Sequence, residues 1–119
     1  MRKIHTKRSA HAQRHLDLFY LDTIMELEDC IKNNDIVIIG MALNPHVKKA
    51  KKAIEEQKFQ YKYKEYGGYF SAWKQRLAIK MWSGWPTFPQ IFVRGTLIGG
   101  ASDTVTAIKN GLFQELKNE

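Results

Sequence analysis

Cysteine is nearly absent from this chain of 119 residues, which contains only Cys30. A single cysteine cannot form a disulfide within the chain, and it excludes a cysteine-rich metal site and a two-cysteine redox motif. Cys30 follows Leu27 in an apolar pattern, so we interpret it as a core or boundary residue. Low cysteine usage is typical of a reducing compartment, and we expect the protein to be cytoplasmic.

Long apolar runs are also missing. No stretch approaches the roughly 20 apolar residues that a membrane-spanning helix needs, so we expect that this is not an integral membrane protein. The first 15 residues are too polar for the apolar part of a secretory signal peptide. The length suits one domain with a single core.

Acidic residues are absent from the first 15 positions. This segment holds five of the 19 basic residues, and the rest of the chain is nearly balanced. We therefore predict a flexible basic tail at residues 1–15 and a folded domain at 16–119. Three tail histidines, His5, His11 and His15, have a spacing that matches no defined metal site. The tail lacks interleaved aromatic residues, so we do not expect nucleic-acid binding to be the main function.

Hydrophobic periodicity and turn residues predict eight elements in the rest of the chain. They are a helix over 16–32, a buried strand over 35–39, a helix over 45–57, a strand around 59–63, a helix over 69–81, a hairpin of strands 90–94 and 96–98, and a helix that Ser102 and Asp103 cap and that runs to about 112. Asn44 and Pro45 are a favoured cap and first residue of a helix. Phe70, Trp73, Leu77 and Met81 share one face of the fifth element.

This order predicts an α/β protein with the thioredoxin fold. An early strand–helix–strand unit calls for two parallel strands joined by a right-handed crossover. The late hairpin adds antiparallel strands, and helices cover both faces. The expected architecture is a central four-stranded mixed sheet flanked by helices.

The segment from Trp85 to Gly95, which reads WPTFPQIFVRG, strongly resembles the glutaredoxins, as do the Leu-Ile-Gly-Gly residues at 97–100. Its Trp-Pro pair is similar to the monothiol branch in particular. The resemblance runs from about Thr23 to Leu116.

The resemblance implies a glutathione-binding surface. In that family the proline that matches Pro89 is cis, and the residue that matches Phe88 pairs its backbone with glutathione. The loop and helix start after the two glycines hold a carboxylate through backbone N–H groups. The glutathione-binding residues implied in this chain are Arg76, Thr87, Phe88, Pro89, Gly99, Gly100, Ala101, Ser102 and Asp103. Ser102 stands where the family usually has an acid, which weakens one charged contact.

One departure decides the expected chemistry. Glutaredoxins carry Cys-Pro-x-Cys or Cys-Gly-x-Ser at the start of the first helix after a strand, and this chain has Asn44-Pro45-His46-Val47 there. Asn44 takes the nucleophile's position, and Met41 replaces the usual lysine. Thiol–disulfide exchange needs a thiolate, so we expect no catalytic residue. The ligand for a shared iron–sulfur cluster is lost with it, and we expect neither that cluster nor another metal.

We therefore expect a monomeric, non-catalytic glutaredoxin-like module that binds glutathione or a peptide segment. One alternative is a glutathione-dependent oxidoreductase in redox homeostasis that uses Cys30, for example in a disulfide-linked dimer. Another is a basic adaptor for an acidic partner, which would use the tail and Lys48, Lys49, Lys51 and Lys52. The sequence leaves open whether the protein is a binding module or an enzyme. We interpret His46 as solvent-facing, Trp73 and Trp82 as core or hinge aromatics, and Trp85 as a wall of the groove.

Overall fold

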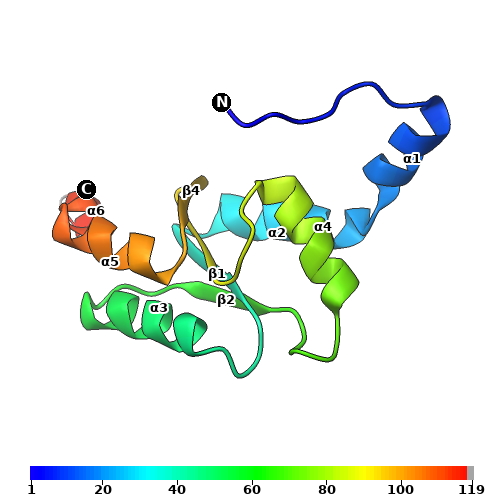
Figure 1. Ribbon diagram of the computed structural model, residues 1–119. Helices are drawn as coiled ribbons and strands as arrows, with labels where there is room; N and C mark the ends of the chain where they lie inside the picture. Colours follow the sequence, from blue (N-terminus) through cyan, green and yellow to red (C-terminus); the bar gives the residue numbers. More distant parts are fainter. Residues whose placement is uncertain (118–119) are drawn as a thin grey trace.

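The computed structural model describes residues 1–117 and has a four-stranded sheet between two layers of helices (Figure 1). The elements are α1 (Ala10–Leu18), α2 (Leu21–Asn33), β1 (Ile36–Gly40), α3 (Pro45–Glu56), β2 (Lys62–Glu65), α4 (Trp73–Ser83), β3 (Gln90–Val93), β4 (Thr96–Gly99), α5 (Ala101–Lys109) and α6 (Leu112–Lys117). Over these described residues, no helix has the length and apolar character that crossing a bilayer would require.

The sheet has the order β2-β1-β3-β4. β1 and β2 are parallel, with Val37 opposite Lys62, and α3 makes the crossover between them. β3 pairs antiparallel with β1 and with β4, which completes a mixed sheet. The predicted fold class is therefore confirmed.

The core lies on both faces of β1, whose five residues are all buried. Val37 and Ile39 point into one cluster with the buried residues of α2 and α4. Ile36 and Ile38 point into the other cluster, with α3, α5 and Phe113 of α6. Alternation of side chains along the strand explains this division, and it accounts for the continuous apolar run in the sequence.

The prediction of a single helix over residues 16–32 is wrong. The chain forms α1 and α2 instead, because Tyr20 adopts a left-handed conformation with φ of 50° between them. α1 begins within the predicted tail, where the Ser9 hydroxyl accepts a hydrogen bond of 3.0 Å from the Ala12 N–H. The Ser9 cap is the sequence signal that the prediction missed.

α4 begins at Trp73, four residues later than predicted, and a different face packs on the core. Ala78 and Ile79 are buried, whereas Leu77, Met81 and Trp73 are exposed by 40%, 49% and 60%. The interpretation of Trp73 as a core or hinge aromatic is wrong for this reason. Trp82, by contrast, packs against the cluster between α2, α4 and the sheet.

The last predicted helix ends three residues earlier than expected, at Lys109, and a further short helix follows it. Gly100 is the residue that precedes α5, so Ser102 and Asp103 lie in its first turn and not before it. Asp103 still caps the helix, because its carboxylate accepts a hydrogen bond from the Gly100 N–H. α5 ends before Gly111, whose φ of 88° suits glycine, and α6 follows.

Candidate functional site

A groove of about 550 Å³ lies where the ends of several elements meet. Its walls come from the loop after β1 and the start of α3, from one face of α4, from the loop before β3 and from the start of α5. The lining residues are Met41, Asn44, His46, Arg76, Lys80, Trp85, Pro86, Thr87, Phe88, Pro89, Gly100, Ala101, Ser102 and Asp103. Segments far apart in the chain therefore build one site.

Asn44 begins the wall formed by α3. Its side-chain oxygen accepts hydrogen bonds from the N–H groups of His46 (2.8 Å) and Val47 (3.2 Å). Pro45 follows as the first helical residue, as the sequence predicted. His46 is exposed, as expected, and it also lines the groove.

The loop before β3 forms the opposite wall. The Phe88–Pro89 peptide bond is cis, as the resemblance implied. The fully buried Gln90 donates a hydrogen bond of 3.0 Å from Nε2 to the Trp85 carbonyl, which fixes the loop to the sheet. Trp85 lines the groove as predicted, and its indole Nε1 is buried without a hydrogen-bond partner among the described residues.

The start of α5 is shaped by two glycines. The N–H of Gly100 donates to the Asp103 carboxylate at 2.9 Å. Gly99 has a φ of 126°, and a Cβ there would lie 2.6 Å from an Asp103 oxygen. Gly99 does not line the groove, but it permits this turn. The N–H groups of Ala101 and Ser102, in the first turn of α5, have no partner within the helix.

The charge in the groove favours anions. Arg76 is buried and donates from Nη1 to the carbonyls of Tyr66 (3.0 Å) and Ser71, while Lys80 Nζ lies 5.8 Å from the centre of the Phe88 ring. Among the described residues that line the groove, Asp103 has the one carboxylate, which already accepts a hydrogen bond from the Gly100 N–H. The starts of α3 and α5 add the partial positive charge of helix N-termini.

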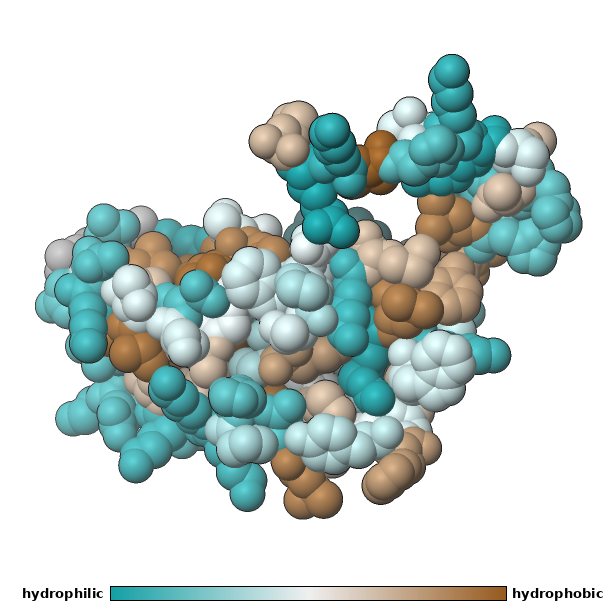
Figure 2. All heavy atoms as spheres, viewed as in Figure 1, coloured by the Kyte–Doolittle hydropathy of each residue, from teal (hydrophilic) through white to brown (hydrophobic). Residues whose placement is uncertain are grey.

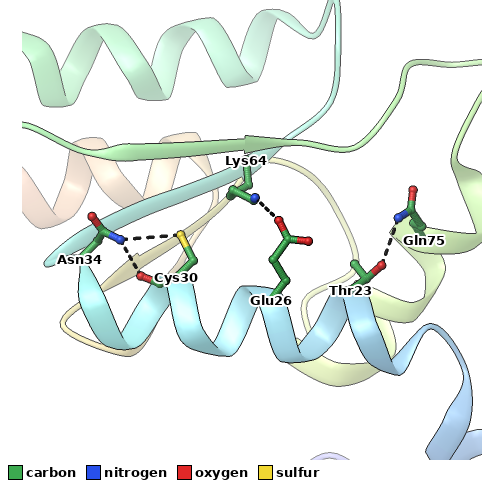
Figure 3. Close-up of polar contacts among 6 residues, drawn as sticks. All are labelled: Thr23, Glu26, Cys30, Asn34, Lys64 and Gln75. Carbon is green, nitrogen blue, oxygen red and sulfur yellow. Dashed lines mark hydrogen bonds and ion pairs between the residues drawn. The ribbon is translucent and has the colours of Figure 1, made fainter.

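Cys30 lies outside this groove, on α2 and half-buried (Figure 3). The Asn34 side-chain amide donates to the Cys30 carbonyl at 2.8 Å and lies 3.8 Å from its Sγ. Cys30 packs against the cluster between α2, α4 and the sheet, which matches its interpretation as a boundary residue. Over residues 1–117 no group of three or more His, Cys, Asp and Glu side chains could hold a metal ion.

Two further contacts in the same view fix α2. Lys64 of β2 forms an ion pair with Glu26, and Gln75 of α4 donates a hydrogen bond of 3.0 Å to the Thr23 hydroxyl (Figure 3). They hold α2 against the edge strand on one side and against α4 on the other.

The structure brings together every predicted site residue except Gly99. Lys80 and His46 also line the groove and were not part of the predicted set. The family resemblance points to Lys80 as well as Arg76, because the monothiol branch often has basic residues at both positions, and the spacing of four places them on the same side of α4.

Comparison with known proteins identifies relatives of this chain. The sequence model of the family described as Glutaredoxin matches residues 45–98. A "Glutaredoxin-like protein" of Dictyostelium discoideum is 50% identical over 119 residues, which cover 99% of this chain and 97% of that protein. The chain belongs to the glutaredoxin family.

Monothiol glutaredoxins are among its relatives. The chloroplastic monothiol glutaredoxin-S7 of Oryza sativa is 48% identical over 40 residues, which are 34% of this chain and 24% of that protein. A crystal structure of a buckwheat glutaredoxin–glutathione complex has a TM-score of 0.68 at 18% identity, covering 83% of this chain and 86% of that one. This glutaredoxin thus shares the fold of solved relatives, and its family supports a redox or glutathione-related role.

Proposed function

We propose that this glutaredoxin-like protein binds glutathione, or an extended peptide segment, reversibly and without forming a covalent bond to it. The observation that carries the proposal is the pairing of a cationic groove with Asn44 where the family has its nucleophilic cysteine. No cysteine lines the groove among the residues that the structure describes.

The chemistry of Asn44 supports a binding role. Thiol–disulfide exchange proceeds by attack of a thiolate, and an amide has no comparable nucleophilicity. The Asn44 oxygen is also committed to two backbone N–H groups of α3. The same argument speaks against an iron–sulfur cluster, because thiolate ligands hold such clusters.

The groove has features that suit glutathione, a small peptide with two carboxylates. We propose that the Phe88 backbone pairs with the ligand's main chain in the manner of an added strand. The N–H groups at the start of α5 would hold one carboxylate, and Lys80 with Arg76 would attract the other. The buckwheat relative was crystallised with glutathione, which supports this ligand class.

A titration of isotope-labelled full-length protein with reduced glutathione tests the proposal. We expect amide shifts at Phe88, Gly100 and Ser102, and weaker binding in Lys80→Gln. Lys74→Gln is the matched control, because Lys74 lies on the same helix but outside the groove. Shifts that never cluster at the groove, or equal affinities in both variants, would contradict the proposal.

The usual chemistry of the family favours one other function, a glutathione-dependent oxidoreductase. Cys30 would have to supply the thiol, although it lies on α2 outside the groove. A mixed-disulfide reduction assay separates the two functions. We expect no glutathione-coupled turnover; activity in the wild-type protein that disappears in Cys30→Ser would establish the oxidoreductase.

We propose a cytoplasmic protein in which one chain is sufficient for binding, with residues 1–15 outside the glutaredoxin-like domain and no nucleic-acid role. An acidic protein partner would meet the exposed Lys48, Lys49 and Lys52 of α3, whereas Lys51 Nζ lies 3.5 Å from the centre of the Tyr63 ring.

A further inference from the structure

A second surface of the molecule exposes large apolar side chains that the glutathione groove does not use. We call it the α2–α4 face, and it consists of Leu21 and Met25 of α2 and Trp73, Leu77 and Met81 of α4, all 39–60% exposed. The residues of each helix lie four apart, so each set forms a row along its helix. Figure 2 shows apolar side chains gathered over α4 and where α1 joins the body.

The two rows meet at an apolar cleft of about 260 Å³. Leu21 and Met81 line it together with Leu16 and Phe19 from the end of α1 and with the partly buried Trp82. Monomeric proteins rarely leave a contiguous apolar surface of this kind uncovered unless a partner binds it.

The charge around the α2–α4 face is basic on the side formed by α1 and α4. Residues 1–18 contain five basic residues and one acidic residue, Asp17. On α4 the base beside this face is Lys74, because Arg76 and Lys80 line the glutathione groove instead. Lys74 is exposed beside Trp73, with Nζ 5.6 Å from the centre of its ring. The carboxylates belong to α2, which carries Glu26, paired with Lys64 at the edge strand, and the exposed Asp22, Glu28 and Asp29. The side of the face that suits an acidic partner is therefore the one formed by α1 and α4.

The exposure of α1 also indicates that a partner covers this part of the molecule. It has nine residues, none of them buried, and Figure 1 shows it standing away from the sheet and its covering helices. An isolated helix shorter than about 12–15 residues is marginal in water. Leu18 is 53% exposed on it, and Arg14 lies beside Leu18 in a shallow hollow of the helix surface.

We propose that the α2–α4 face and α1 together bind an acidic, amphipathic helix of a partner protein. The partner's apolar side chains would enter the cleft and cover Leu77 and Met81. Its carboxylates would face Arg14, Lys74 and the basic residues 1–8. This surface is separate from the groove, so the inference does not depend on glutathione binding.

The probe is a fluorescein-labelled synthetic peptide of about 18 residues, enough for five helical turns, with leucines on one helical face and glutamates elsewhere. It is titrated against the full-length protein by fluorescence anisotropy, and the unlabelled peptide by amide shifts. We expect saturable binding, with shifts at Leu21, Met25, Leu77 and Met81 and in α1. The affinity for the peptide should fall as the salt concentration rises, and this fall should be less steep for the double variant R14Q/K74Q.

Leu77→Asp should weaken binding about tenfold or more, because it places a charge where apolar surface would be buried. Leu43→Asp is the control, since it makes the same change at an exposed leucine in the loop before α3. Thermal melts check that both variants fold. A second control is a peptide of the same composition whose leucines are scattered around the helix.

Four results would overturn the proposal. The first is that the peptide with scattered leucines binds as tightly as the amphipathic one. The second is that Leu77→Asp and Leu43→Asp lower the affinity equally. The third is that the free protein sediments as a dimer that Leu77→Asp dissociates. The fourth is binding to phosphatidylcholine–phosphatidylserine vesicles that Leu77→Asp abolishes while the peptide fails to bind. The last two would assign the surface to a second copy or to a membrane.

Discussion

The Asn44 side-chain oxygen accepts a hydrogen bond from the His46 N–H at 2.8 Å, which joins the corner of the groove to the first turn of α3. Asn44→Ala removes this cap and should lower the free energy of unfolding by about 1 kcal/mol. Asn44→Ser keeps a capping oxygen and should stay within a few tenths of a kcal/mol of the wild type. Urea denaturation measures both. Equal stabilities of the alanine and serine variants would show that the cap contributes nothing.

Asn44→Cys should create a reactive thiol. A cysteine at a helix N-terminus near cations has a lowered pKa, because both stabilise the thiolate. Arg76 and Lys80 line the same groove as position 44. In a Cys30→Ser background, thiolate absorbance followed against pH should give a pKa below the ordinary value of about 8.5. A thiol that titrates at that ordinary value would contradict the placement of position 44.

Gly99→Ala should destabilise the start of α5 more than a comparable change elsewhere. A φ of 126° is nearly confined to glycine, and the new Cβ would meet the Asp103 carboxylate at 2.6 Å. We expect a loss of about 2 kcal/mol or more, with weaker glutathione binding. Gly84→Ala is the control: Gly84 also has a positive φ, of 78°, but nothing lies within 4 Å of a Cβ there. That variant should lose about 1 kcal/mol and keep its glutathione affinity.

Tyr66 makes the stability depend on alkaline pH. Burial, and then the charges of Glu26 and Cys30, raise its pKa from the ordinary value near 10 to about 12. Between these values the unfolded chain loses a proton that the folded chain keeps, so the stabilisation present below about pH 10 is lost as pH rises. Urea unfolding at several pH values should show a shallower decline in Tyr66→Phe.

The same variant has a second expected effect near neutral pH. The Tyr66 hydroxyl is buried without a hydrogen-bond partner among the described residues, so its removal relieves a desolvation cost. Tyr66→Phe should be at least as stable as the wild type there. A marked loss of stability would mean that the hydroxyl has a partner in solution.

Local patterns were sufficient to predict the sheet and the start of α3, whereas the residues expected to bind glutathione came from the family resemblance. β1 reads as a buried strand because both of its faces are covered, and Asn44-Pro45 marks the start of α3 because both residues suit a helix start. The cis bond before Pro89 came from the family resemblance, since spacing alone does not reveal it.

The layer formed by α2 and α4 was harder to predict, because its packing depends on residues far away in the sequence. The apolar row Trp73, Leu77 and Met81 has helical spacing, but Ala78 and Ile79 face the core. The turn at Tyr20 has a non-glycine residue with φ of 50°, which leaves no glycine or proline signal. An exposed apolar row and a buried one look alike in a sequence.

The central claim is that the groove binds glutathione without any cysteine. The most direct test is the equilibrium affinity of Cys30→Ser for reduced glutathione, measured beside the wild-type protein by isothermal titration. We predict the same dissociation constant for both proteins, with full release of the ligand on dialysis in the absence of a reductant. Loss of binding in Cys30→Ser, or a bound fraction that only a reductant releases, would contradict the account.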